Sequence, residues 1–294
     1  MVIGDASSGR SSRIALSFDV EEWFQTAAVS PRGGAPMSSV RRRRAPYLVA
    51  GLIDMLSGFG ARATFFVLGN LLEAEPSIAD IVTGSGNELA CHGWDHRSLV
   101  EMNRNDFRTD ISRCLETWSR LSLPPPLGYR APSFSVTVEN SGWVAEELSA
   151  AGFRYDSSVF PIPRIRYGIP DAPLAPYRLA GSRLIELPLA AVPALGLRIP
   201  AAGGAWMRFM PLWVHSLLLA RACASGRTPV LYAHPWEFDL PFDGERGFPW
   251  IVRLRQGRGG GGRMRRAVAG LLGRYGSITL ACLSAESIGK REPR

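Results

Sequence analysis

Short apolar runs along the chain alternate with longer segments whose apolar residues recur at helical spacing. The short runs are bounded by turn residues, as is typical of buried strands. We therefore predict strands at residues 13–18, 63–68, 88–91, 184–187, 230–233 and 277–281.

The segments between these runs predict helices. In the clearest one, an Asn103 and Asp106 capping pair precedes an apolar stripe at helical spacing, formed by Phe107, Ile111, Leu115, Trp118 and Leu121. The other predicted helices are residues 46–59, 71–82, 143–151, 212–224 and 264–275, of which the first and the third end at Gly60 and Gly152.

Strands that alternate with helices indicate βα units, and we expect one barrel-like α/β domain over residues 13–284. A flexible N-terminus (1–12) precedes it and a C-terminal tail (285–294) follows it. The proline-rich stretch 161–183 predicts a long surface loop, and the glycine-rich stretch 256–263 predicts a flexible loop. No repeat and no clean domain boundary interrupts this pattern.

Composition fits a globular protein with a sizeable core. The 294 residues are 46% hydrophobic and 20% charged, with a formal net charge of +8. Lys290 is the only lysine, so the basic residues are almost entirely arginine. This bias is more typical of genome composition than of a nucleic-acid-binding surface. The arginine run 41–44 has two readings: the solvated start of a helix, or a patch for an anionic polymer or a membrane surface.

The cysteines favour a reducing compartment. Four cysteines are widely scattered without a CxxC pair, and we expect Cys114 and Cys282 to be buried free thiols. The N-terminal residues lack an apolar signal region, and no segment offers the 18 or so unbroken apolar residues of a membrane span. The expected location is cytoplasmic.

Candidate chemistry lies at the carboxyl ends of predicted strands. Asp19 and Glu21 follow the first strand, His92 follows residues 88–91, and His234 follows residues 230–233. In an α/β barrel these strand ends converge on one face, where catalytic groups sit. The convergence predicts one shared site.

A divalent metal is the first ligand to expect there. His92 and His96 are four residues apart, a spacing that brings both imidazoles to one side of a helical turn, and Glu21 adds a carboxylate. Asp19 would then lie near the metal without necessarily binding it. Because a bound cation lowers the pKa of water from about 15.7 toward about 7, a modest carboxylate base would complete the deprotonation.

Two further motifs complete this hypothesis. Arg130 could pair with Asp19 and orient it, and His234 has an imidazole suited to protonating a leaving group. Each of these residues could instead have a structural role. Asp19 and Glu21 could cap a helix, Arg130 could form a structural salt bridge, and His234 could be a turn residue. His215 lies within a predicted helix and is read as structural. The ordered occurrence of all the motifs favours a metal-dependent hydrolase.

These motifs resemble the polysaccharide deacetylase superfamily, the NodB-homology proteins of carbohydrate esterase family 4. The match runs from about Arg13 to Ser284 and rests on SFDVEE (17–22), ATFFVLG (63–69), HGWDH (92–96), YRAPSF (129–134) and LYAHPWE (231–237). More narrowly, FRYDSS (153–158), YGIP (167–170) and HPWE (234–237) are similar to the exosortase-associated subgroup, whose members accompany bacterial exopolysaccharide gene clusters.

The resemblance implies a distorted (β/α) barrel that removes N-acetyl groups from polysaccharide amino sugars. It implies that the catalytic base, its positioning arginine and the catalytic acid are Asp19, Arg130 and His234. It implies metal binding by His92 and His96, with Zn²⁺ the expected ion. The substrate-binding positions that it implies are Phe134, Leu231 and Trp236.

One departure from the family pattern affects the metal site. Many members carry adjacent aspartates in the first motif, but here Val20 occupies the second position. Some relatives place the acidic ligand one residue further on, which assigns Glu21 here and keeps Glu22 as the alternative. Asp156 is the candidate acid that tunes His234, although its motif differs from the usual one.

Alternatives of other kinds stay open. Some relatives cleave small cyclic amides or ureides, and a decayed enzyme could serve as a carbohydrate-binding scaffold. The expected partners are an N-acetylated polysaccharide or lipid-linked oligosaccharide and, peripherally, membrane biosynthetic machinery. The sequence leaves open the sugar, the chain length, the metal used in the cell and the oligomeric state.

Overall fold

The computed structural model describes residues 12–26, 43–163, 168–194, 196–239 and 260–289. Several expectations lie partly outside these ranges: most of the N-terminal segment 1–12, the arginines at positions 41 and 42, part of the loop 161–183, the first half of the glycine-rich loop 256–263, and residues 290–294 of the C-terminal tail. Among the described helices, none combines the length and the apolar character needed to cross a lipid bilayer.

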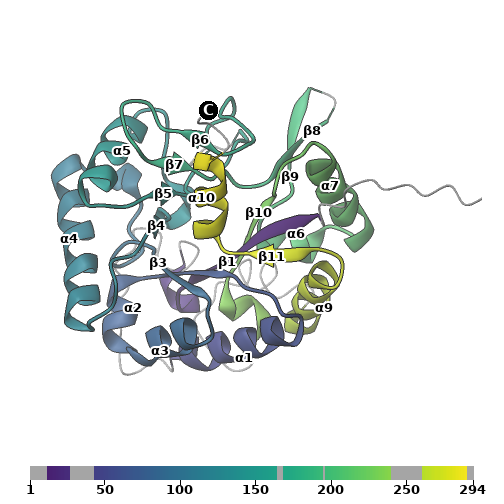
Figure 1. Cartoon of the computed structure of the whole chain (residues 1–294), viewed down its shortest axis with the longest axis horizontal. Helices are drawn as coiled ribbons and strands as arrows, with labels where there is room; N and C mark the ends of the chain where they lie inside the picture. Colours follow the sequence, from purple (N-terminus) through teal and green to yellow (C-terminus); the bar gives the residue numbers. More distant parts are fainter. Residues whose placement is uncertain (1–11, 27–42, 164–167, 195, 240–259, 290–294) are drawn as a thin grey trace, which may run out of the picture.

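A curled parallel sheet forms the centre of the molecule (Figure 1). Its strands lie in the order β10-β1-β2-β3-β4-β5-β7, with bounds Val230–Ala233, Arg13–Val20, Thr64–Val67, Glu88–Cys91, Gly128–Tyr129, Tyr155–Asp156 and Ile185–Glu186. Short β6 (Tyr177–Arg178) pairs antiparallel with β7, and β11 (Gly276–Ile278) pairs with the start of β1. A parallel bridge between Leu189 and Val230 links the two ends of the sheet. This is the distorted barrel that the sequence predicts.

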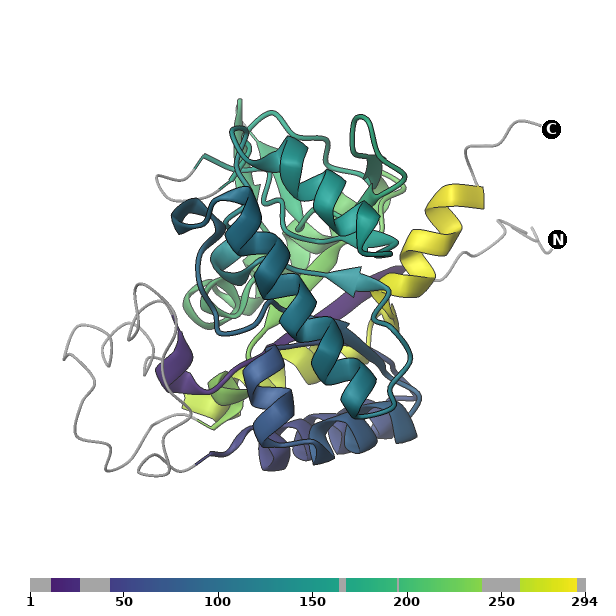
Figure 2. The same cartoon turned by 90° about the vertical axis from the view of Figure 1, so that its left-hand side faces the viewer.

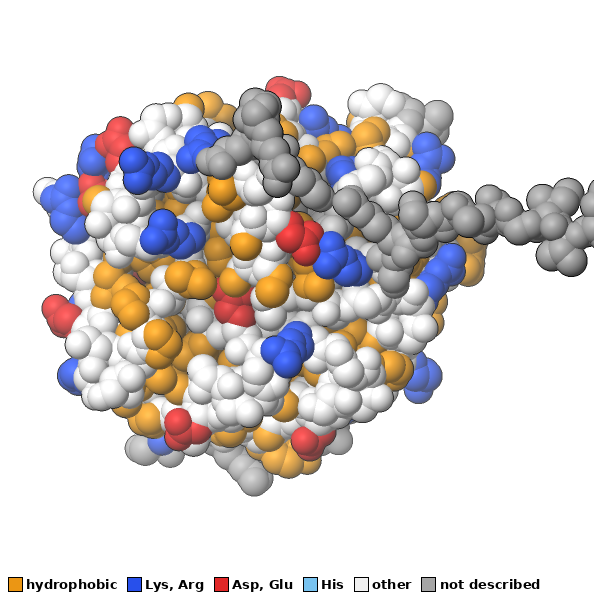
Figure 3. All heavy atoms as spheres, in the orientation of Figure 1, with side chains coloured by type: hydrophobic (Ala, Val, Ile, Leu, Met, Phe, Trp, Pro, Cys, Tyr) orange, Lys and Arg blue, Asp and Glu red, His pale blue; other side chains and the backbone are white. Residues whose placement is uncertain are grey.

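Helices surround the sheet, with one exception (Figures 1 and 2). They are α1 (Ala45–Gly58), α2 (Gly69–Ala74), α3 (Ser77–Gly84), α4 (Arg104–Arg120), α5 (Ser141–Ala150), α6 (Gly204–Phe209), α7 (Leu212–Ala224), α9 (Gly260–Leu272) and α10 (Leu280–Gly289). The exception is α10, which lies in front of the middle of the sheet in the view of Figure 1. A separate hairpin of β8 (Ala191–Ala194) and β9 (Leu197–Pro200) stands beside α7. On the face shown in Figure 3, the basic side chains are spread among apolar and uncharged ones.

The capping pair of α4 is confirmed. The side chain of Asn103 accepts hydrogen bonds from the backbone N–H groups of Asn105 and Asp106, and the Asp106 carboxylate accepts the N–H of Asn103. Phe107, Ile111 and Trp118 are buried, as the helical spacing predicts. Side-chain acceptors at this position satisfy backbone donors that the first turn leaves unpaired.

Two predicted elements are wrong in part. The single helix expected at 71–82 is two helices, α2 and α3, because Pro76 between them lacks the N–H and clashes with the preceding turn. The strand expected at 277–281 ends at Ile278, and α10 follows it. Leu280, Leu283 and Ser284 of that helix are buried while Cys282 is exposed, so the burial predicted for Cys282 is also wrong; Cys114 is buried as expected.

An ion-pair cluster joins α4 to α5 and makes one pH-dependent prediction. Arg104 Nε lies 2.6 Å from Glu147 Oε1, and Arg108 Nε lies 2.8 Å from Oε2. Hydrogen bonds from Arg108 and Arg104 lower the pKa of Glu147 to about 2. Because the unfolded carboxyl has a pKa of about 4.3, this cluster stabilises the fold above that pH and loses its effect as pH falls through about 2.

Glu147→Gln is therefore expected to lower the melting temperature at pH 7, with a difference from the parent that shrinks between pH 5 and pH 2. Thermal unfolding followed by circular dichroism over this range measures it. A difference that stays constant with pH would show that the ionised carboxylate is not the stabilising form.

Candidate metal and catalytic site

The strand register brings the predicted polar residues to one edge of the sheet. Phe18 of β1 pairs with Ala233 of β10, Val67 of β2 pairs with Cys91 of β3, and Cys91 pairs with Tyr129 of β4. The residues that end or directly follow these strands therefore lie at a common level: Asp19, Glu21, His92, Arg130 and His234. The predicted convergence of strand ends is confirmed.

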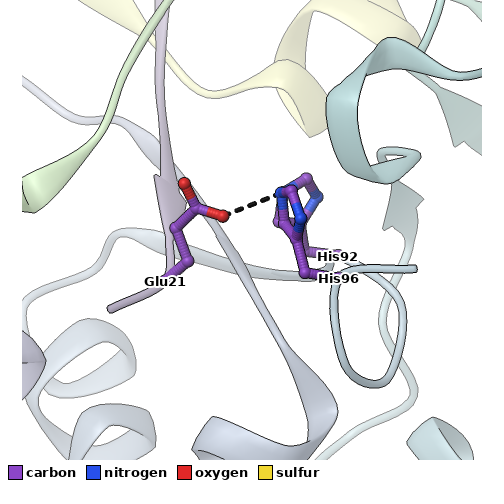
Figure 4. Close-up of side chains that lie close together, drawn as sticks. All are labelled: Glu21, His92 and His96. Carbon is purple, nitrogen blue, oxygen red and sulfur yellow. Dashed lines mark ion pairs between the residues drawn. The ribbon is translucent and has the colours of Figure 1, made fainter. Parts of the chain in front are cut away.

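Glu21, His92 and His96 form a buried cluster with the composition of a metal site (Figure 4). One potential ligand atom from each lies within 4.8 Å of the other two. The Nδ1 atom of His92 lies 2.8 Å from the carbonyl oxygen of Arg130, and His96 Nε2 lies 2.8 Å from Glu21 Oε2. Because a carbonyl only accepts, Nδ1 of His92 carries the proton and Nε2 keeps the lone pair that a metal needs.

The ionisation of two of these groups suits a cation. Burial lowers the pKa of His92 to about 4, since the nearby carboxylates of Asp19 and Glu21 offset it only in part. Burial raises the pKa of Glu21, but the charges of His96, His234 and His92 and a hydrogen bond from His96 outweigh it and lower that pKa to about 2. At neutral pH the site therefore contains a neutral imidazole and an ionised carboxylate, which are the ligating forms.

The loop that carries both histidines is not helical, so the expected helical turn is wrong. Gly93 and His96 both have positive φ, 76° and 65°, which a helix does not allow. Asp110 of α4 accepts the backbone N–H of Trp94 at 2.9 Å, and a Cβ atom on Gly93 would lie 3.3 Å from the same carboxylate. Tertiary contacts with α4, which the sequence pattern did not reveal, thus shape the loop.

Glu22 points away from the histidines. Its Oε1 atom accepts the backbone N–H groups of Arg44 and Ala45, at 2.6 and 2.9 Å, and so satisfies free donors at the start of α1. Burial raises the pKa of Glu22, and these two hydrogen bonds lower it in part. Of the two glutamates that the sequence leaves open, the structure brings Glu21 to the histidines.

Asp19 and Arg130 form a buried ion pair. Arg130 Nη1 lies 2.7 Å from Asp19 Oδ1 and 2.8 Å from Ser17 Oγ. The rest of the guanidinium donates to the carbonyl and the hydroxyl of Ser157, and its carbon lies 4.1 Å from the ring centroid of Phe66. With all three guanidinium nitrogens hydrogen-bonded, Arg130 can hold the Asp19 carboxylate in one orientation.

His234 lies on the other side of the cluster and is 20% exposed. Its Nε2 atom is 3.5 Å from Glu21 Oε1 and its Nδ1 atom is 3.4 Å from Glu237 Oε2, while the ring stacks on Trp236. Burial lowers the pKa of His234, but the hydrogen bond and charge of Glu237, with Glu21 and Asp19, outweigh it and raise that pKa to about 9. An imidazole in this setting can hold and release a proton next to the metal cluster.

Asp156 is not brought to His234. Its Oδ1 atom accepts the hydroxyl of Ser158, and its strand β5 pairs it with Glu186 of β7. Burial raises the pKa of both carboxyls. The negative charge of Asp156 raises the pKa of Glu186 further. The carboxylate beside Nδ1 of His234 belongs to Glu237, and sequence reasoning missed it although it lies in the HPWE motif.

The predicted substrate-binding side chains are all buried. Leu231 is fully buried, and Phe134 and Trp236 are 6% and 4% exposed. Trp236 Nε1 donates to Glu21 Oε1 at 3.4 Å, and the ring of Phe134 lies 4.5 Å from that of Tyr232. Their roles toward a substrate stay predictions. His215 is buried against the carbonyl of Ala201, in keeping with a structural role.

Two family models match successive parts of the chain. Residues 39–155 match the family described as polysaccharide deacetylase, and residues 157–271 match a domain of unknown function (DUF3473). The first stretch contains His92, His96 and Arg130, and the second contains His234 and Glu237. The site therefore draws residues from both.

Curated relatives match over part of their length. A peptidoglycan-N-acetylglucosamine deacetylase of Bacillus cereus is 27% identical over 96 residues, which are 33% of this chain and 35% of the relative. A peptidoglycan-N-acetylglucosamine deacetylase of Listeria monocytogenes is 26% identical over 136 residues, which are 46% of this chain and 24% of the relative. The matched region thus spans about a third or less of these proteins.

A solved structure shares the fold over nearly the whole chain. A crystal structure from Mycobacterium smegmatis, of a protein assigned to the polysaccharide deacetylases, aligns with a TM-score of 0.62 at 21% identity. The alignment covers 99% of this chain and 95% of that one. At this identity the likeness concerns the fold.

Proposed function

Since this chain belongs to the polysaccharide deacetylase superfamily, we propose that it removes N-acetyl groups from polysaccharide amino sugars by metal-dependent hydrolysis. DUF3473 is the C-terminal domain of the exosortase-associated subgroup, in keeping with the motifs of the sequence. The observation that carries the proposal is the buried Glu21, His92 and His96 cluster with the Asp19–Arg130 pair and His234 beside it.

The donor set fits a divalent cation. Two imidazoles and one carboxylate are a known ligand set of catalytic zinc, in which further positions stay open, and Zn²⁺ is the ion that we propose. When bound, such a cation supplies Lewis acidity, which polarises a carbonyl and lowers the pKa of water to about 7.

Two residues of the protein carry out the two proton transfers. Asp19, held by Arg130, accepts a proton from the water that attacks the acetyl carbonyl. His234 donates a proton through Nε2, the atom that faces Glu21, to the departing sugar nitrogen. The C–N bond breaks as this proton arrives, and the products are acetate and a free amine.

The substrate that we propose is an N-acetylated polysaccharide or lipid-linked oligosaccharide of bacterial exopolysaccharide biosynthesis. The names of the curated relatives support N-acetylglucosamine as the type of sugar, because those proteins deacetylate it in peptidoglycan. The cytoplasmic location and an association with membrane machinery remain predictions.

Acetate release from N-acetylglucosamine oligomers tests the proposal. Purified protein is assayed as isolated, after chelation, and after Zn²⁺ is added back. We expect chelation to abolish release and the metal to restore it. Release unaffected by chelation would contradict metal dependence. Hydrolysis of allantoin-like ureides without release from sugars would replace the proposal with the cyclic-amide alternative, and a protein that binds no metal and is inactive on both would point to the scaffold.

A further inference from the structure

A row of three side chains runs from the site into the protein: His234, Glu237 and Arg208. Glu237 Oε2 lies 3.4 Å from Nδ1 of His234 and also accepts the backbone N–H of His234 at 2.9 Å. The other carboxylate oxygen, Oε1, forms an ion pair with Arg208 Nη1, and both of these side chains are 2% exposed.

The fold is built closely around this carboxylate. Glu237 lies on the short turn η4 (Pro235–Phe238), and Arg208 comes from α6, 29 residues earlier. A Cβ atom on Gly204, in the first turn of α6, would lie 1.8 Å from Glu237 Oε2, so only glycine fits there. Preceding it, Gly203 has φ 105°, a conformation that favours glycine. Helix α6 therefore approaches Glu237 with both its backbone and its arginine.

We propose that Glu237 is the positioning residue of His234, and that Arg208 holds Glu237 in place for this purpose. The inference rests on the proposed deacetylase function for its catalytic consequence. A carboxylate 3.4 Å from Nδ1 favours the proton on that nitrogen, and Nε2 on the opposite side of the ring lies 3.5 Å from Glu21 Oε1. Glu237 thereby takes the role predicted for Asp156. The segment matched by DUF3473 contains His234, Glu237 and Arg208. Positioning of the proton donor is therefore a function that this segment performs here.

Capping of η4 alone does not account for the arrangement. A cap needs one acceptor for a backbone N–H, which Oε2 provides. It does not need a buried arginine on the second oxygen, and burying such a pair costs several kcal/mol of desolvation per ion. With Arg208 on Oε1 and the backbone N–H of His234 on Oε2, the carboxylate is held at both oxygens, as a positioning role requires.

The main test replaces both members of the ion pair. Glu237→Leu alone would leave Arg208 buried without its partner, so the double variant Glu237→Leu/Arg208→Met is the informative one, since apolar replacement of a whole buried pair is often tolerated. We expect kcat to fall by about 10–100-fold, as is typical when an outer-shell partner is lost, with KM and metal content unchanged. Glu237→Gln keeps an acceptor oxygen and should recover part of kcat.

A second readout does not depend on activity. With only four histidines, ¹⁵N-imidazole labelling of the Zn²⁺-loaded protein resolves each ring, and each is assigned by single substitution. Above the pH at which His234 loses its charge, we expect the proton on Nδ1 in the parent and in Glu237→Gln. In the double variant we expect a mixture of tautomers.

Glu147→Gln is the matched control, because Glu147 is also held by arginines but joins α4 to α5. It should keep kcat and the His234 tautomer. An active parent whose double variant keeps both kcat and the Nδ1 proton would overturn the inference and leave the proposed function standing. A parent that releases no acetate but shows the tautomer change would refute the function and support the positioning of His234.

Discussion

Asp19→Asn is expected to reduce the rate of acetate release by about 10²–10⁴-fold, the usual contribution of a general base, without loss of bound metal. Asparagine has nearly the same shape but cannot accept the proton of the attacking water. Asp19 lies outside the cluster of Glu21, His92 and His96, so metal content should stay at the parent level. Steady-state kinetics and elemental analysis of the same preparation measure both quantities.

The fold of this variant has to be checked, because it removes the charged partner of a buried arginine. Arg130 keeps its hydrogen bonds to Ser17 and to both the carbonyl and hydroxyl of Ser157, so we expect a folded protein with a lower melting temperature. Loss of metal in Asp19→Asn would move Asp19 into the ligand set. Turnover at the parent rate would remove it from the mechanism.

Glu21→Gln is expected to weaken metal binding by more than the 10–100-fold that loss of an outer-shell partner typically costs. The substitution removes the negative charge of the cluster, whose carboxylate lies 2.8 Å from His96. Metal retained after dialysis, and affinity measured by competition with a chromophoric chelator, give the result. Turnover at limiting Zn²⁺ should fall in parallel and recover at high Zn²⁺ only as far as the metal returns.

The neighbouring residue offers a matched control. Glu22→Gln makes the same chemical change one position further on, but Glu22 accepts the N–H groups of Arg44 and Ala45 at the start of α1. We expect it to keep its metal and to change only the free energy of unfolding. Parent-like metal affinity in Glu21→Gln together with metal loss in Glu22→Gln would reverse the assignment.

Local sequence patterns predicted much of the fold because their physical causes are local. Side-chain alternation and burial define a strand, and Asn103 with Asp106 defines the start of α4 through hydrogen bonds within one turn. The errors arose where local cues competed. Pro76 broke an otherwise helical pattern, and the short apolar run before Cys282 fitted a strand as well as the helix that forms there.

The order of the motifs and their places after the strands were enough to predict which residues meet: parallel strands in register end at one edge, so Asp19, Glu21, His92, Arg130 and His234 follow from the βα pattern. How they meet was decided by contacts between distant segments. The path of the loop after His92 depends on the contact of Trp94 with α4, the choice of Glu21 over Glu22 depends on the free N–H groups of α1, and the pairing of Glu237 with Arg208 depends on α6. The sequence around a carboxylate does not show which donor it will contact. That depends on how the helices pack, and the sequence pattern predicts the order of the helices along the chain but not their packing.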